Sequence, residues 1–238
     1  MILNPSNVGW PCCNFLELSA AYRFATDPTK GDDSKNSYDL TVAGGPSWDA
    51  GGKNNGCLQF TGSSDKVSNG ALLDSTDFSA CGWFKCDSVL SNGDKVYPFL
   101  VDDSSLPGND TGIAFVHDGS LNPTYAAHAM FEGVDQGDMF GGTTFDLSDW
   151  VWWALLIDVD GFSQLRVNSQ ARVNMHVSAG LNHTDAQTFR CQPAEDGHTM
   201  IGEIDEVYIQ KGKLWDTNTL NALYNSGDGK FVDENGDI

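Results

Sequence analysis

The sequence predicts an all-β protein, a sandwich or barrel of short strands with one short helix near the C-terminal end. Three observations support this prediction. Asp accounts for 27 of the 33 acidic residues and the chain contains 26 Gly, a composition typical of turns and loops rather than helix interiors. Short strand patterns recur between turn clusters. Of the 238 residues, 40% are hydrophobic, which is enough to form a sizeable core.

The expected strands are runs of apolar and β-branched residues bounded by Asp, Gly, Ser and Asn. The run from Trp150 to Ile157 is apolar at every position, which predicts a strand that is covered on both faces. We expect strands at Leu18–Phe24, Tyr38–Val42, Gly56–Thr61, Phe78–Cys86, Val96–Val101, Gly112–His117, Thr124–Phe131, Trp150–Asp158, Gln164–Val167 and Ile201–Gln210.

A single helix is expected, at Thr217–Tyr224. Asp216 or Thr217 can cap its N-terminus, because both side chains carry an oxygen that accepts a hydrogen bond from the first turn. The polar segment Asn225–Gly227 can end it.

The chain contains no repeat and no low-complexity linker, so we expect one domain over residues 15–227. Residues 1–14 are expected to form an irregular N-terminal arm, and residues 228–238 an acidic tail with little apolar material. We expect the core to include Phe24, Phe60, Trp83, Trp152, Leu155, Val207 and Ile209.

The formal net charge of −20 argues against two classes of partner. Nucleic-acid binding needs clustered Lys and Arg, and docking on anionic lipid needs a basic surface. The N-terminus has neither a basic segment nor an apolar one of the kind found in export signals, and no stretch approaches the ~18 apolar residues of a membrane span. We therefore expect synthesis in a host cytoplasm without a signal peptide, and no membrane insertion.

Cysteine and histidine give no sign of a metal centre. The five histidines are scattered without metal-binding spacing, and the cysteines form no paired C-x-x-C motif. Widely spaced cysteines in a reducing compartment are expected to be small core residues. The six cysteines are Cys12, Cys13, Cys57, Cys81, Cys86 and Cys191.

The segment that begins with Glu203 and Asp205 resembles part of an active site. It opens the E-x-D-x-E signature of laminarinase-type glycoside hydrolases, in which alternate carboxylates of one strand point into one cleft. The next position on the same face is Val207, and a bulge would supply Tyr208, so the second catalytic carboxylate is missing. We expect both carboxylates to share a face with Val207 and Ile209, and to lie near the rim or be buried and hydrogen-bonded.

A hydrolase with a degenerate active site is the alternative. Glu203 and Asp205 would then have to work with a carboxylate from elsewhere in the chain, such as Asp118 or Glu132.

Six segments resemble, in the same order, those of the laminin-G-like members of the concanavalin A-like lectin/glucanase superfamily. They cover most of residues 20–230, whereas the stretch from Asp87 to Asp149 matches nothing specific. The six are Tyr22–Phe24 with Asp27 and Asp33–Thr41; Gly56–Val67; Phe78–Lys85; Trp150–Leu155; Val159–Gly161 with Leu165–Asn168; and Gly202–Ile209 with Leu223–Gly227.

The resemblance implies a jelly roll of two antiparallel sheets. Members of this superfamily include glycan-binding modules, adhesion domains and virion surface proteins, and many hold a Ca²⁺ ion at the rim of the sandwich. The Tyr224–Gly227 ending is most similar to those of tailed-phage virion proteins. Because one fold hosts many functions, the function must be argued from the site.

One set of candidate ligand residues lies around a predicted loop. Asp102 and Asp103 end a strand pattern and open the loop that contains Asn109 and Asp110. Their oxygen atoms suit Ca²⁺ and sugar hydroxyls, although solvated turn residues have the same composition. The resemblance places a Ca²⁺ ion at the rim, for which the expected ligands are Asp27, Asp102, Asp103 and Asp205.

Trp10 and Trp48 lie in Gly- and Pro-rich contexts, where an indole ring can stack on a sugar or fill a gap in the packing. With no catalytic residue assigned, we expect a non-enzymatic, lectin-like module on the surface of a phage virion. Its expected partners are other virion proteins or copies of itself, and host-surface glycans.

Overall fold

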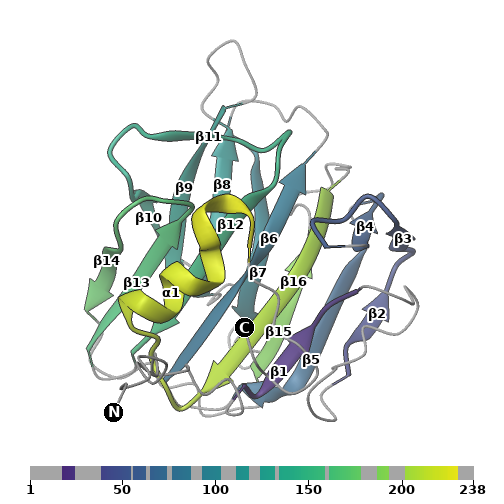
Figure 1. Cartoon of the computed structure of the whole chain (residues 1–238), viewed down its shortest axis with the longest axis horizontal. Coiled ribbons are helices and arrows are strands. Elements are labelled where there is room, and N and C mark those ends of the chain that lie inside the picture. The colour runs from purple at the N-terminus through teal and green to yellow at the C-terminus, as the bar shows by residue number, and fades with distance from the viewer. Residues whose placement is uncertain are drawn as a thin grey trace, which may run out of the picture.

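A computed structural model describes residues 18–24, 39–54, 56–62, 65–73, 77–86, 93–102, 111–117, 124–131, 134–158, 161–177, 187–192 and 202–229. These residues form two antiparallel sheets packed face to face, with one short helix on the outside of the first sheet (Figure 1). The predicted fold class, an antiparallel β-sandwich with a C-terminal helix, is confirmed.

Sheet A has the main order β14 (Val173–Val177), β13 (Phe162–Val167), β12 (Val151–Ile157), β6 (Phe78–Cys86), β16 (Gly202–Lys211), β4 (Cys57–Phe60) and β3 (Ser47–Asp49). Its central strand pairs are β12–β6 and β6–β16, and the short β1 (Ala20–Tyr22) pairs with β16 outside the main order.

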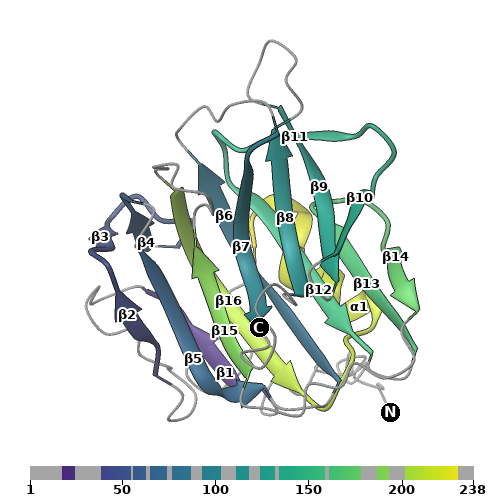
Figure 2. The same cartoon turned by 180° about the vertical axis from the view of Figure 1, so that it is seen from behind.

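Sheet B forms the opposite layer, which faces the viewer in Figure 2, and β11 (Thr144–Asp146) pairs with β9 outside the main order. Its main order is β10 (Val134–Asp138), β9 (Thr124–Phe131), β8 (Thr111–His117), β7 (Lys95–Asp102), β15 (Gln187–Gln192), β5 (Lys66–Leu73) and β2 (Thr41–Ala43).

The main core lies between the sheets, where aromatic side chains of both layers meet. Trp153 of sheet A and Phe99 of sheet B have ring centroids 5.1 Å apart, and Phe84 stacks on Phe115 at 6.2 Å. Trp152 belongs to a second apolar cluster, on the outward face of sheet A. Because side chains alternate along a strand, the apolar run of β12 supplies both clusters, which confirms the prediction that it is covered on both faces.

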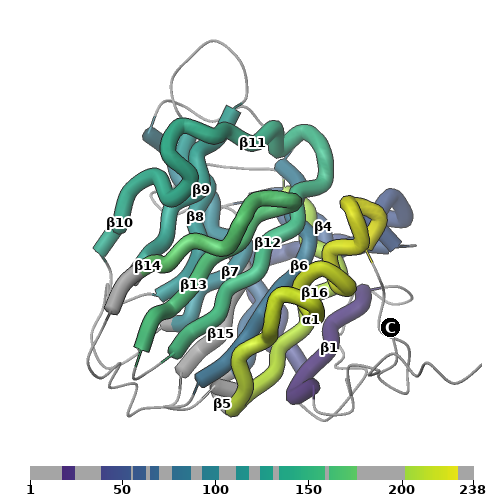
Figure 3. Tube along the Cα trace, turned by 60° about the vertical axis from the view of Figure 1, so that its left-hand side comes forward, coloured from purple at the N-terminus to yellow at the C-terminus, as the bar shows by residue number. Residues whose placement is uncertain are grey.

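The second cluster is covered by α1 (Thr217–Tyr224), which runs along the outward face of β12, β6 and β16 (Figure 3). Leu220 and Leu223 are the buried residues of the helix. Tyr224 packs on Trp83 and Trp152, with ring centroids 6.4 Å and 5.5 Å apart. The outward face of sheet A is therefore a second core.

Polar contacts hold the helix in place. Asp216 accepts a hydrogen bond from the backbone N of Thr219 at 2.8 Å, as an N-cap does. At the other end, Asn225 is left-handed with φ 43°, and the 3₁₀ turn Asn225–Gly227 follows. Arg166 of β13 donates to Asn221 Oδ1 at 2.7 Å. The predicted helix and its cap are confirmed.

Every predicted strand overlaps a strand of the structure, and β6 and β9 have the predicted bounds. The sequence did not predict β3, β5, β10, β11, β14 and β15. All seven predicted core residues are buried, although Trp83 and Trp152 lie under the helix rather than between the sheets. No helix among the described residues is long and apolar enough to span a membrane.

Candidate functional site

A bulge in β16 decides where the carboxylates of the hydrolase-like segment point. The pairing with β6 shifts between Asp205 and Tyr208, and Glu206 has φ 49°. Ile204 and Val207 both belong to the core between the sheets, although three positions separate them. The extra residue of the bulge therefore reverses the alternation of side chains.

The expectation that Glu203 and Asp205 share a face with Val207 and Ile209 is wrong, because it assumed an unbroken strand. Both carboxylates lie on the outward face of sheet A, opposite the face of Ile204. The bulge also adds Glu206, a third carboxylate that the sequence argument missed.

The carboxylates of Asp205 and Glu206 are buried and hydrogen-bonded. For Asp205 this is one of the two expectations, the other being a place near the rim. Asp205 is 0% exposed and accepts from the backbone N atoms of Asn54 and Glu206, each at 2.8 Å. Glu206 is 1% exposed and accepts from Asn54 Nδ2 at 3.0 Å and from the Tyr208 hydroxyl. Arg23 Nε lies 3.9 Å from Glu206 Oε1.

Burial also changes how readily these two groups ionise. Burial and then the neighbouring Glu206 carboxylate raise the pKa of Asp205 to about 8. Burial raises the pKa of Glu206 to about 7, against the hydrogen bonds from Tyr208 and Asn54. The two carboxyl groups clamp the loop around Asn54 to β16, so their role is structural.

Glu203 is also hydrogen-bonded, to side chains of the two neighbouring strands. It accepts from Lys85 Nζ and from Gln59 Nε2, each at 3.4 Å, and is 5% exposed. Asp118 and Glu132, the partner carboxylates of the hydrolase alternative, lie outside the described residues. The strands before them, β8 and β9, belong to sheet B, whereas β16 belongs to sheet A.

Among the described residues, one group places metal-ligating atoms close together. Ligand atoms of Asp49, Cys57 and Glu203 lie within 4.8 Å of one another. The Cys57 thiol donates to the Asp49 carbonyl at 3.7 Å, and burial followed by the nearby carboxylates, Glu203 foremost, raises the pKa of that thiol. A protonated thiol is a poor metal ligand, so this group does not resemble a Ca²⁺ site.

The structure describes only some of the other predicted ligand residues. Trp48 lies on β3, is half-buried and donates from Nε1 to the Phe24 carbonyl at 2.8 Å. A Cβ atom on Gly56 would lie 2.5 Å from this nitrogen, so Trp48 fills space, as a packing plug does. Asp102 ends β7, and its side chain is not described. The remaining candidates, Trp10, Asp27, Asp103, Asn109 and Asp110, lie outside the described residues, and the Ca²⁺ site stays a prediction.

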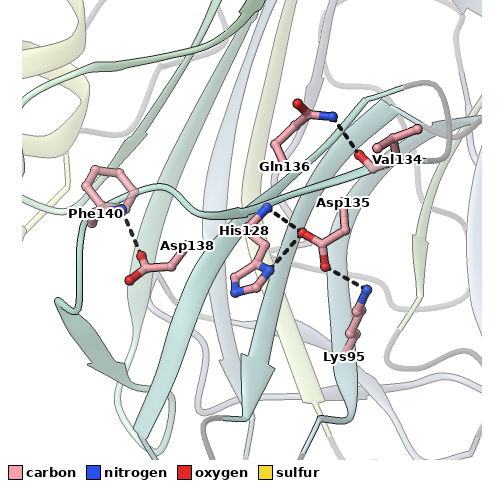
Figure 4. Close-up of polar contacts among 8 residues, drawn as sticks. Lys95, His128, Val134, Asp135, Gln136, Asp138 and Phe140 are labelled. Atoms are coloured by element: carbon pink, nitrogen blue, oxygen red, sulfur yellow. Dashed lines mark hydrogen bonds and ion pairs between the residues drawn. The ribbon is translucent and has the colours of Figure 1, made fainter.

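The outward face of sheet B carries a charged cluster that the sequence analysis did not single out (Figure 4). Lys95 of β7 donates to Asp135 Oδ2 of β10 at 2.7 Å. His128 Nδ1 of β9 lies 2.8 Å from Asp135 Oδ1. Three strands thus bring an amine, an imidazole and a carboxylate together, and we call Lys95, His128 and Asp135 the sheet B cluster.

A bulge in β10 orients the Asp135 carboxylate. The pairing with β9 shifts between Asp135 and Asp138, and Gly137 within this stretch has φ 81°. Only glycine adopts this left-handed conformation without a steric cost. The backbone N of Gly137 donates to Asp135 Oδ1 at 2.8 Å, which orients the carboxylate further.

The sheet B cluster is charged and open to solvent. The side chains of Lys95, His128 and Asp135 are 30%, 16% and 27% exposed. Partial burial opposes ionisation of Asp135, but hydrogen bonds from Lys95, Gly137 and His128 together hold its pKa below the ordinary value. An oriented, ionised carboxylate beside an amine and an imidazole can bind polar ligands.

Comparison with known proteins gives a fold but no family. No protein-family model matches the sequence, and no curated protein matches it. Domain 4 of AbnA, a GH43 extracellular arabinanase from Geobacillus stearothermophilus solved in complex with arabinotriose, has a similar structure. Its TM-score is 0.63 at 17% identity, with 84% of this chain and 94% of that chain covered. The two structures share a β-sandwich fold.

Botulinum neurotoxins supply the other similar structures. The binding domain of serotype D/C has a TM-score of 0.61 at 14% identity and covers 89% of this chain. A structure of neurotoxin type C, whose cell entry depends on interaction with two ganglioside molecules, has a TM-score of 0.60 at 14% identity and covers 90%. The chain spans about half of each neurotoxin chain, 52% in both cases.

Proposed function

We propose that this protein is a carbohydrate-binding module and that the sheet B cluster is its ligand site. The observation that carries the proposal is the convergence of Lys95, His128 and Asp135 on one solvent-reachable spot of a lectin-like sandwich. Support comes from the similar folds of a domain solved with arabinotriose and of neurotoxins that interact with gangliosides.

The chemistry of the cluster suits sugar hydroxyls. A hydroxyl group donates one hydrogen bond and accepts others, and Asp135 offers an acceptor directly beside the Lys95 donor. Charge-assisted hydrogen bonds are roughly twice as strong as neutral ones, so a small number of them can orient a sugar. Because Asp135 is oriented before a ligand arrives, little ordering cost remains for binding.

Binding to linear arabinan, galactan, dextran and ganglioside oligosaccharides tests the proposal by isothermal titration calorimetry. Asp135→Ala should weaken binding about tenfold or more, since a hydrogen bond to a charged group contributes about 1.5–3 kcal/mol. Asp146→Ala is the matched control, because Asp146 is an exposed carboxylate of the same sheet whose partner is Ser148. Equal loss in both variants, or no binding of any sugar, would contradict the proposal.

We propose no hydrolase activity for this module. Its β16 carboxylates are buried, and a glycosidase needs two carboxyl groups that reach the scissile bond. We expect no release of reducing ends from β-glucans. Turnover that disappears in Glu203→Gln would overturn this part of the proposal.

The module is further proposed to lie on the surface of a phage virion, with other virion proteins or copies of itself as partners. The support is the order of the six resembling segments and the Tyr224–Gly227 ending. Deletion of residues 1–14 is expected to abolish incorporation into particles while the sandwich still folds. Full occupancy of particles by the truncated chain would show that the arm is not the anchor.

A further inference from the structure

We infer that the sheet B cluster selects neutral glycans over acidic ones; this inference rests on the proposed function. The argument starts from the His128–Asp135 contact of 2.8 Å. An ionised carboxylate only accepts hydrogen bonds, so the proton of a neutral imidazole must sit on Nδ1. The other ring nitrogen of His128, Nε2, then carries a lone pair and acts as an acceptor.

The remaining hydrogen-bonding capacity of the cluster is mixed. Lys95 has three N–H donors, and Asp135 is its one hydrogen-bond partner among the described residues. Asp135 Oδ1 already accepts from Gly137 N and His128, whereas Oδ2 accepts from Lys95 alone. A ligand therefore meets donors on Lys95 and acceptors on His128 Nε2 and Asp135 Oδ2.

A pair of sugar hydroxyls matches this arrangement, because each hydroxyl can donate to one of the acceptors while accepting from Lys95. A carboxylate or sulfate group has acceptors only. It can use the Lys95 amine but must face two acceptors, one of them ionised, without a proton to offer them. An acidic group in place of a hydroxyl therefore leaves the acceptors of His128 and Asp135 unpaired. Unpaired polar groups in a site allow strong discrimination between ligands.

Charge acts in the same direction. The single positive charge of Lys95 is already paired with Asp135. A further acidic residue, Asp138, pairs with His128 across the β9–β10 ladder. The whole chain carries −20, so an anionic polysaccharide is repelled before it reaches the site.

The ion pair joins two strands that are not neighbours in sheet B. Lys95 lies opposite Val116 of β8, yet its amine reaches Asp135 in β10, two strands further along the sheet. The amine thus reaches past β8 and β9, the two strands that lie between β7 and β10. Figure 4 shows the amine, the carboxylate and the imidazole lying along the outward face.

The experiment compares neutral polysaccharides with their acidic derivatives at about pH 8, above the range in which histidine ordinarily gains a second proton. The probes are dextran against dextran sulfate, galactan against polygalacturonate, and cellulose oligomers against carboxymethylated ones. Dissociation constants are measured in physiological salt, which screens long-range repulsion. We expect at least one neutral probe to bind, and its acidic counterpart to bind at least tenfold more weakly.

Asp135→Asn sharpens the test, because the amide replaces one acceptor by a donor and removes the negative charge. We expect the ratio of neutral to acidic affinity to fall at least tenfold, with an unchanged circular dichroism spectrum. An acidic probe that binds the wild type as tightly as its neutral counterpart overturns this inference and leaves the proposed function standing. Binding of no probe, neutral or acidic, overturns the proposed function itself.

Discussion

The two outward faces of the sandwich each carry a cluster of polar groups that includes a carboxylate, and the clusters differ in what surrounds them. On sheet A, Asp205 and Glu206 are almost fully buried, and their oxygens are taken up by a loop and a tyrosine. On sheet B, Asp135 is 27% exposed and its partners are charged or titratable side chains. The first pair holds a loop to β16, whereas we propose that the second cluster binds a ligand. The structural role of the sheet A pair and the proposed binding role of the sheet B cluster thus differ because only the second is accessible to solvent. Resemblance to a catalytic motif does not distinguish them.

The outward face of sheet A and α1 form a core with Trp152 near its centre. Removing this side chain should therefore lower the stability of the protein strongly. Trp152→Ala should lower the free energy of unfolding by about 3–5 kcal/mol, because the cavity lies between β12 and α1. Chemical denaturation measures this value. Phe162→Ala, at an exposed aromatic residue of the adjacent strand, is the control and should change stability by under about 0.5 kcal/mol. A loss of less than ~1 kcal/mol in Trp152→Ala would show that helix and sheet do not form a core.

The buried pair of sheet A should make stability fall as the pH rises. The pKa values of Asp205 and Glu206 are raised to about 8 and about 7, so the folded state holds protons that the unfolded chain releases. This contribution is complete below the unfolded pKa of a carboxyl group and is lost as the pH approaches 8. Between about pH 5 and pH 7 the free energy of unfolding should fall by on the order of 2 kcal/mol.

The Asp205→Asn, Glu206→Gln double variant isolates this effect. Its free energy of unfolding should depend less steeply on pH over the same range, whatever its absolute stability, because neither substituted group titrates. An unchanged pH slope would show that the pair is ionised in the folded protein. Asp146→Asn is the matched control and should leave the slope unaltered, since the pKa of Asp146 is lowered by hydrogen bonds from Ser148, which does not titrate in this range.

The cap of α1 should have a moderate effect, because it secures one end of the cover over sheet A. Asp216→Ala should cost about 1 kcal/mol, the ordinary value for loss of an N-cap. Asn218→Ala, at an exposed position in the same first turn, should change stability by less than half as much. Thermal unfolding of the two variants side by side measures the difference, and equal values would contradict the capping geometry.

The sheet B cluster should contribute least to stability. Lys95→Ala removes an ion pair whose partners are about one-third exposed, so the free energy of unfolding should change by no more than ~1 kcal/mol. Lys66→Ala removes the same charge from an exposed position of β5 and serves as the control. A loss well above 1 kcal/mol in Lys95→Ala alone would mean that the cluster is structural, like its counterpart on sheet A.

Much of the fold could be predicted from local patterns. Strand β12 stands out because it is a continuous apolar run, and β6 because most of its residues are apolar. The helix α1 stands out because Asp216 and Asn225 mark its ends. The weaker strands, such as β10 and β14, are short and lie at the edges of their sheets. Edge strands need no continuous apolar face, and they therefore leave little trace in the sequence.

The candidate site could not be predicted in the same way. The order of residues gives no sign that β16 contains a bulge, and one extra residue changes which side chains face the core. Lys95 and Asp135 are 40 residues apart and meet only because β7, β8, β9 and β10 are neighbours in sheet B. Both residues fall within the stretch that resembled nothing specific. The Asp-Gln-Gly segment of the β10 bulge was the one available signal, because Gly after polar residues suggests a turn or bulge.

The most direct test of the central claim is to locate a bound glycan on one of the two faces. Backbone amide chemical shifts are recorded by NMR while the tightest-binding neutral oligosaccharide is titrated into the labelled protein. We expect the largest shift changes at Gly137, at His128 and around Lys95, with the amides of Asn54 and Glu206 unaffected. Changes centred on β3, β4 and β16 would contradict the account, because they would place the ligand on the face that we describe as sealed.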